Sequence, residues 1–342
     1  MLIKSSSQLT FKGSTRGWDF ERVPESIAYR DNHRIEYRRE WLLIWCSCYK
    51  HESLLSFDWT HRWDWGGGEY HKSHRNNERD FCTTNPINFV TCVEISVAIK
   101  GVPSGRSPGP SGLSYDYLKS TVNICPEIVD DLAFFFNSVI MGRFKLPQAL
   151  TSSRLVALIK PGGGVRPIAV GESLKRLLAI ICFKRVKSSA IYFFRPYQFA
   201  IGIPDGTTSA VLCTDLLFNQ KFSIENYLLN IDFKNAFNSV FRCSILQELE
   251  LHYPPLLPYF KLMYGSPSNL IFHSENIVSS RGVKQGDPLG PFFFCLALQS
   301  VLVKFKSDFP DIHICAYADD LSLIGPLSLS QYGLQHFVFL FK

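Results

Sequence analysis

The chain has 342 residues, of which 46% are hydrophobic and 19% are charged. This balance excludes a disordered tail and a fibrous repeat, and the length suggests roughly two domains of about 150 residues each. The 36 basic and 30 acidic residues leave a net charge of +6, which favours polyanionic partners without identifying one.

Metal-binding and targeting signals are weak. The ten cysteines include no CxxC pair and no histidine at zinc-finger spacing, so no zinc site is predicted. The opening residues lack the apolar core of a secretory signal. The most apolar run, Leu289 to Val303, is shorter than the roughly 20 residues that span a bilayer. We therefore expect an intracellular protein of the cytoplasm or nucleus, not secreted, with no membrane anchor and with reduced thiols.

The beginning of the chain differs in composition from the rest. All six tryptophans lie before residue 75, and residues 61–79 have neither helical nor strand periodicity. We expect residues 1–85 to be an N-terminal segment of unknown fold, either disordered or spurious. The interpretations that stay open are an unrelated fusion, host-derived sequence, and a decayed or wrongly joined reading frame.

From about residue 85 onward, helix and strand signals alternate. In chain order, the expected elements are helices at 113–122 and 127–141, strands at 155–160 and 165–170 joined by a PGGG turn, a helix at 173–189, a strand at 227–233, a helix from about 239, a loop at 281–288 leading into a helix to about 305, and strands at 313–317 and 321–324 around a two-residue turn. This order predicts a mixed α/β (α+β) fold.

Three aspartates are the most informative residues. Asp319 and Asp320 lie at the predicted hairpin tip, which alone would be an ordinary solvated turn. Asp232 ends an apolar strand, where packing explains a carboxylate poorly because burying one without a partner is costly. If strand and hairpin are neighbours in one sheet, Asp232 and Asp319 face each other with Asp320 alongside. Such oxygen ligands suit Mg²⁺, and two ions about 3.5–4 Å apart would promote phosphoryl transfer.

Six motifs follow one another along the chain. They are RSPGPSGLSYDYLK (106–119), LIKPGGGVRPIAV (158–170), PYQFAIGIPDGTTSA (196–210), NIDFKNAFNSV (230–240), RGVKQGDPLGP (281–291) and YADD (317–320). In this order the motifs resemble the reverse transcriptase of non-LTR (LINE-like) retrotransposons.

The resemblance implies a right-hand polymerase fold, with an antiparallel palm sheet flanked by helices. Fingers would occupy residues 86–225 and an incomplete palm residues 226–342, with the thumb missing because only 22 residues follow Asp320. The implied activity is RNA-directed DNA polymerisation, a nucleotidyl transfer from dNTP to a DNA primer on an RNA template. Two Mg²⁺ ions, which Mn²⁺ can replace, would assist it. The oligomeric state is left open.

The resemblance also assigns roles to individual residues. Asp232, Asp319, Asp320 and the backbone carbonyl of Phe233 would bind metal, and Phe237 would be the steric gate against ribonucleotides, although it could instead be a core aromatic. For Asp287 and Pro288, a structural role as cap and first turn of the next helix is as plausible as a functional one. The implied nucleotide-binding residues are Lys160, Arg166, Phe237, Gln285, Gly286 and Tyr317.

A basic segment contains the second motif and continues toward the third. Residues 154–187 hold eight basic residues and one acidic residue, a net charge of +7. A positive stripe is the expected footprint of a groove that follows a nucleic-acid backbone. The predicted nucleic-acid-binding residues are Arg154, Lys175, Arg176, Lys184, Arg185 and Lys187.

Two alternatives stay open beside the active polymerase. One is a catalytically inactive relic that binds nucleic acid through the basic segment. The other is a reverse transcriptase of the group II intron type, whose palm motifs are similar.

Overall fold

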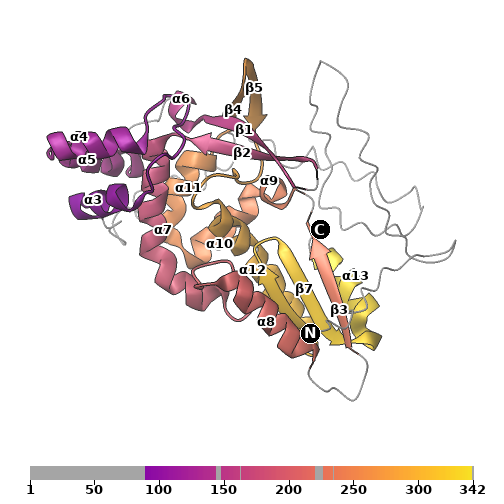
Figure 1. The fold of residues 1–342 in the computed structure, drawn as a ribbon. Helices are drawn as coiled ribbons and strands as arrows, with labels where there is room; N and C mark the ends of the chain where they lie inside the picture. The colour runs from indigo at the N-terminus through magenta and orange to yellow at the C-terminus, as the bar shows by residue number, and fades with distance from the viewer. Residues whose placement is uncertain (1–88, 144–147, 162, 220–225, 234, 341–342) are drawn as a thin grey trace, which may run out of the picture. The chain divides into compact units, whose positions relative to one another are not determined.

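Two β-sheets organise the part of the chain that the structure, a computed structural model, describes (Figure 1). The N-terminal segment expected at residues 1–85 lies outside that part. No helix within the described part is long and apolar enough to cross a membrane. The described residues are 89–143, 148–161, 163–219, 226–233 and 235–340.

The first sheet has the strand order β2-β1-β4-β5. β1 (Ser153–Ile159) and β2 (Val165–Gly171) form an antiparallel hairpin, as predicted. β4 (Ser268–Phe272) runs parallel to β1 and is paired in turn with β5 (Glu275–Ser279). The sequence did not predict this second hairpin. The sheet combines strands from both sides of the expected boundary between residues 225 and 226.

The second sheet is antiparallel, with the order β3-β7-β6. Its strands are β3 (Asn226–Asp232), β6 (His313–Tyr317) and β7 (Asp320–Pro326). β3 and β7 are far apart in sequence but adjacent in space, as the carboxylate argument requires. Helix α8 (Gly206–Phe218) packs against all three strands, and α12 (Gly290–Asp308) contacts β6. The predicted mixed α/β architecture with an antiparallel, helix-flanked palm sheet is confirmed.

A group of helices packs around the long α7 (Ser173–Phe194). α3 (Cys92–Gly101) begins with a capping box, in which Thr91 and Glu94 each satisfy the other's backbone N–H. Figure 1 shows α7 running from α3 and its neighbours toward the second sheet. The other helices of the described residues are α4 (Tyr115–Ile124), α5 (Ile128–Ile140), α6 (Gln148–Thr151), α9 (Ala236–Ser239), α10 (Arg242–His252), α11 (Leu257–Tyr264) and α13 (Ser330–Leu340), with 3₁₀ turns at Pro254–Leu256 and Leu327–Leu329.

Helix α7 continues five residues beyond its predicted end near residue 189. The extension is apolar, and both Ala190 and Phe194 are fully buried, so packing favours the extra turn. Pro196 disfavours helical backbone at the residue before it. Accordingly, the last residue of α7 is Phe194.

Aromatic rings of α12 form the centre of the core. Phe292, Phe293 and Phe305 are at most 1% exposed, and Phe292 meets Phe194 of α7 edge to face at 5.6 Å. Burial of such a ring contributes about 1.5–3 kcal/mol, and the edge-to-face pair adds about 0.5–1.5 kcal/mol. The core thereby fixes α12, and with it the loop of residues 281–289 and strand β6.

Candidate active site

The turn between β6 and β7 positions the first pair of aspartates. Tyr317 pairs with Asp320 across the hairpin, so Ala318 and Asp319 form a two-residue turn. The sequence predicted a tip that also held Asp320, but Asp320 is the first residue of β7. Ala318 has φ of 54°, the left-handed backbone typical of tight hairpin turns. Residues other than glycine adopt it at a cost of about 1 kcal/mol or more.

The third aspartate comes from β3. Asp232 lies directly opposite Asp320 in the β3–β7 register, and both are exposed, whereas Asp319 is half-buried. Burial raises the pKa of Asp319, and the charges of Asp320 and Asp232 raise it further, while Arg166 lowers it. The structure therefore brings the three carboxylates into one electrostatic neighbourhood.

The donor set fits a divalent cation chemically. Like charges directly opposite each other destabilise a sheet, and a cation would relieve that repulsion. Mg²⁺ commonly takes only one or two carboxylates and fills its other positions with water and phosphate oxygens. In the described ranges, no three acidic, histidine or cysteine side chains are close enough to hold a metal by themselves. Asp232 and Asp320 are thus placed to contribute to such a site without forming a closed cage.

Phe233 and Phe237 follow β3. The Phe233 ring is buried, and its carbonyl accepts a long hydrogen bond from Ala236 N at 3.4 Å. Phe237 is half-buried, its ring 4.9 Å from that of Phe294. The Phe237 ring therefore packs partly on the core. This position is compatible with a steric gate and with a core aromatic.

Gln285 and Gly286 attach the loop of residues 281–289 to the first sheet. Gln285 O accepts a hydrogen bond of 2.6 Å from Ala169 N in β2. Gly286 has φ of 118°, and a Cβ built there would lie 2.5 Å from Ala169 O. Gly286 therefore allows the loop to approach the backbone of β2 closely, and only glycine permits this approach.

A buried polar network lies beneath this loop, and the sequence did not reveal it. Asp287 accepts hydrogen bonds from the hydroxyls of Tyr264 (2.6 Å) and Tyr259 (3.2 Å). Asp287 Oδ1 also accepts from Leu289 N at 3.0 Å, although α12 begins only at Gly290. Asp287 therefore lies before the helix and does not occupy the cap position that the sequence suggested for it.

Lys284 belongs to the same network. It is 5% exposed, its ammonium donates to Thr151 O at 3.0 Å, and burial lowers its pKa to about 6. The charge of Asp287 opposes that shift only in part, since burial is the largest cause. No sequence pattern marks these residues, because they come from different elements and meet only in the fold.

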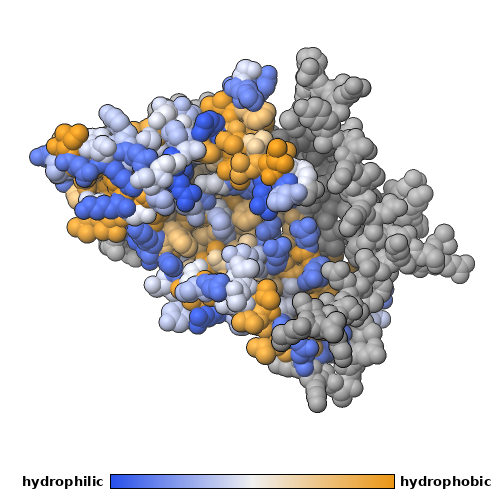
Figure 2. Space-filling view, in the orientation of Figure 1, coloured by the Kyte–Doolittle hydropathy of each residue, from blue (hydrophilic) through white to orange (hydrophobic). Residues whose placement is uncertain are grey.

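Lys160 and Arg166 lie on the β1–β2 hairpin and are both exposed. Lys160 N donates to Gly164 O at 3.0 Å, which closes the PGGG turn. The influence of Arg166 on the pKa of Asp319 connects this hairpin electrostatically with the carboxylates. Figure 2 shows hydrophobic side chains over the first sheet, where Leu158, Ile159 and Val165 are at least half exposed at the hairpin's end.

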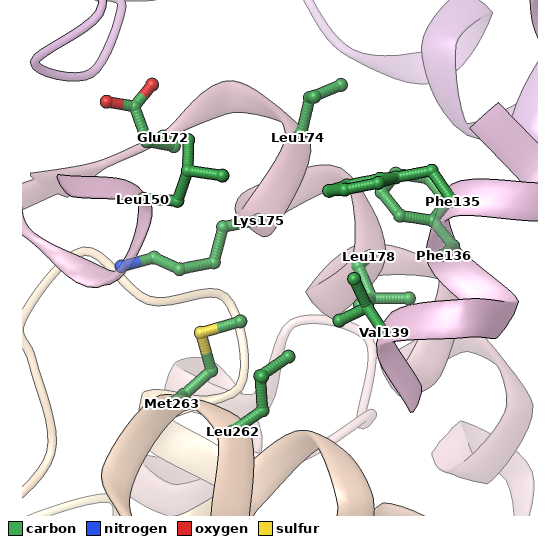
Figure 3. Close-up of a pocket in the computed structure, with 10 residues that line it drawn as sticks. All are labelled: Phe135, Phe136, Val139, Leu150, Glu172, Leu174, Lys175, Leu178, Leu262 and Met263. Carbon is green, nitrogen blue, oxygen red and sulfur yellow. The ribbon is translucent and has the colours of Figure 1, made fainter. Parts of the chain in front are cut away.

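The expectation that Lys175 lies on a nucleic-acid-binding surface is wrong. Lys175 is 8% exposed, and its ammonium donates to Thr151 O (3.2 Å) and Ser153 Oγ (3.3 Å). Figure 3 shows its side chain extending between Leu150 and Met263. Burial also lowers its pKa. Charge alone did not reveal that this side of α7 faces the interior.

The other basic residues of the segment are more accessible but differ in their contacts. Arg176 donates to Ser107 O at 2.7 Å. Arg185 donates from Nε and Nη2 to the two carboxylate oxygens of Glu94, at 2.6 and 2.7 Å. Lys184 and Lys187 are exposed on α7. Arg154, also exposed, donates to Pro108 O at 3.2 Å. The predicted stripe is thus interrupted by protein contacts, and its function stays a prediction.

The two sheets and the connecting helices define the fingers-and-palm class of nucleic-acid polymerases. The chain belongs to the reverse transcriptase (RNA-dependent DNA polymerase) family, whose model matches residues 158–335. This result confirms the resemblance to non-LTR retrotransposon reverse transcriptases.

Similar proteins come from several retrotransposons. The chain is 26% identical to the retrotransposable element SLACS 132 kDa protein of Trypanosoma brucei gambiense over 65% of its own length and 19% of that protein. It is 29% identical to the Pol polyprotein of the type-2 element R2DM of Drosophila melanogaster, over 68% of its own length and 23% of that protein. It is 28% identical to the Pol polyprotein of the type-1 element R2 of Popillia japonica, over 68% of its own length and 34% of that protein. The chain therefore spans between a fifth and a third of these relatives.

Proposed function

We propose that this chain is the fingers-and-palm part of a retroelement RNA-directed DNA polymerase. It joins a dNTP to the 3′-hydroxyl of a DNA primer on an RNA template. The observation that carries the proposal is the β3–β7 register, which sets Asp232 opposite Asp320 and beside the turn that holds Asp319, within a chain of the reverse transcriptase family.

The metal ligands in this proposal are Asp232, Asp319, Asp320 and the Phe233 carbonyl. Reverse transcriptases use divalent metal ions, and we propose two Mg²⁺ ions here, with Mn²⁺ as a substitute. When bound, such ions supply charge stabilisation to the attacking and leaving oxygens of an in-line displacement. The protein's own part is to hold the carboxylates next to one another and to position the substrates.

Residues around the carboxylates bind the incoming nucleotide. Lys160 and Arg166 contact its triphosphate, for which a compact ammonium and a planar guanidinium are suited. Phe237 excludes the ribose 2′-hydroxyl, and Gln285, Gly286 and Tyr317 line the nucleotide position. The influence of Arg166 on the pKa of Asp319 supports this placement, because it connects the fingers hairpin to the palm carboxylates.

The test is primer extension on an RNA template with Mg²⁺, comparing wild type with Asp319→Asn. We expect the variant to lose at least about 10³-fold in rate, because a lost ligand removes several kcal/mol of transition-state stabilisation. Asp311→Asn is a matched control: Asp311 is exposed and lies just before β6, so extension should stay within about twofold. Extension that survives Asp319→Asn refutes the site.

Two further measurements separate the proposal from its rivals. Phe237→Ala should raise ribonucleotide incorporation, and unchanged sugar selectivity would remove Phe237 as the gate. Filter binding of template RNA across a salt series identifies the inactive binder, which would show a salt-dependent affinity without any nucleotide incorporation.

A further inference from the structure

Gln198 lies in the connection between α7 and α8, and its side chain is buried at 1% exposure. The carboxamide reaches the turn that carries Asp319. Its Oε1 accepts a hydrogen bond of 2.7 Å from Ala318 N, and its Nε2 donates to Ala318 O at 3.2 Å. One side chain therefore binds both backbone polar groups of the residue that precedes Asp319.

The backbone around Gln198 is itself fixed. It forms a parallel bridge with Ala316 of β6, in which Phe199 N donates to Ala316 O and Ala316 N donates to Tyr197 O, each at 2.8 Å. Gln198 Oε1 also accepts from Ala200 N at 3.2 Å. The connection thus lies along the free edge of β6, and the carboxamide is held by a rigid support.

The start of helix α8 packs against the same connection. A Cβ built on Gly206, the first residue of α8, would lie 2.1 Å from Phe199 O and 3.4 Å from the Tyr317 ring. The helix start is therefore packed tightly against both the connection and the hairpin. The backbone next to Gln198 is therefore held directly against α8.

The turn needs such support because of its conformation. Ala318 has φ of 54°, a region that residues other than glycine rarely occupy. The peptide between Ala318 and Asp319 sets the direction in which the Asp319 side chain leaves the backbone. Without its two hydrogen bonds, Ala318 could return to negative φ, which would redirect Asp319 away from Asp232 and Asp320.

We infer that Gln198 is a positioning residue, whose carboxamide holds Ala318 in the left-handed conformation and thereby presents Asp319 to the divalent cation. This inference rests on the proposed function, since it concerns the same carboxylates. It assigns a role to a residue that contacts neither the substrate nor the cation. Within the described part of the chain, the side-chain hydrogen bonds of Gln198 reach its own connection and this turn.

The test replaces Gln198 by methionine, which keeps its length and removes both hydrogen bonds to Ala318 as well as the one from Ala200 N. Gln299→Met is the matched control, because Gln299 is also a buried glutamine (3% exposed) whose Nε2 donates to Phe193 O at 3.1 Å. Two quantities are measured on the full chain: amide hydrogen exchange at residues 318–320, and the affinity for Mn²⁺ at the site that Asp319→Asn abolishes.

In Gln198→Met we expect exchange at residues 318–320 to become at least about tenfold faster and Mn²⁺ binding about tenfold weaker, whereas Gln299→Met changes neither. Unchanged exchange at residues 318–320 overturns the inference. Faster exchange with unchanged Mn²⁺ affinity overturns it as well, because the turn would then be irrelevant to the cation.

A second variant covers the case in which Gln198→Met does not fold. Gln198→Asn keeps the carboxamide but is one methylene too short to reach Ala318, so it should give the same two effects. If wild type and Asp319→Asn bind Mn²⁺ equally, the proposed metal site fails, and with it the part of the inference that concerns the cation. The exchange measurement still decides whether Gln198 holds the turn.

Discussion

Gly286 offers the sharpest prediction about how the fold is held together. In Gly286→Ala the new Cβ would lie 2.5 Å from Ala169 O, whereas real Cβ contacts stay above 3.0 Å. The loop must therefore move from β2 by at least about 0.5 Å, which weakens the hydrogen bond between Ala169 N and Gln285 O, worth about 1 kcal/mol. The φ of 118° adds about 1–3 kcal/mol of backbone strain.

Together these effects predict a loss of about 2–4 kcal/mol in the free energy of unfolding. The assay is urea denaturation, read as the change in midpoint at constant slope. Gly164→Ala separates strain from collision, because Gly164 has φ of 77° but nothing within 4 Å of a built Cβ, so it should lose only about 1 kcal/mol. Equal losses in the two variants would refute the proposed contact with β2.

Three other predictions test the buried network and the basic surface. Tyr264→Phe removes a buried donor to a carboxylate and should cost about 1–3 kcal/mol in urea denaturation, whereas Tyr192→Phe, at a 77% exposed site, should stay within about 0.5 kcal/mol. Because the pKa of Lys284 falls to about 6, the unfolded chain binds a proton that the folded chain lacks. Stability should therefore rise between pH 6 and 10 by up to about 1.4 kcal/mol per unit, with a smaller slope in Lys284→Met. Replacing Lys184 and Lys187 by glutamine should lower the salt slope of RNA binding by up to about 2 in filter binding, and an unchanged slope would exclude these lysines from the interface.

The sequence predicted those parts of the site that local pattern determines. Apolar strands that end in Asp232 and that surround Asp319 indicate where the carboxylates lie, because such a pattern places the ends of strands reliably. The β1–β2 hairpin followed equally from its PGGG turn. The register that sets Asp232 opposite Asp320 is a consequence of packing between distant segments and could only be assumed.

The parts that could not be predicted depend on tertiary burial. Helix α7 is buried on several sides, as Leu177, Ala179, Ile181 and Cys182 show, so Lys175 faces the interior although its charge suggested a surface. The contacts of Gln198 with Ala318 likewise join residues 120 positions apart in sequence. No periodicity marks such pairs, because each partner fits its own element without the other.

The most direct test of the central claim is single-nucleotide addition to a DNA primer on an RNA template in Mg²⁺, by wild type and by Asp232→Asn. Asp232 comes from a different strand than the hairpin aspartates, so the measurement tests whether the register creates one site. We predict addition by wild type and a loss of at least about 10³-fold in the variant. Addition by Asp232→Asn within about twofold of wild type, or no addition by wild type, would contradict the account.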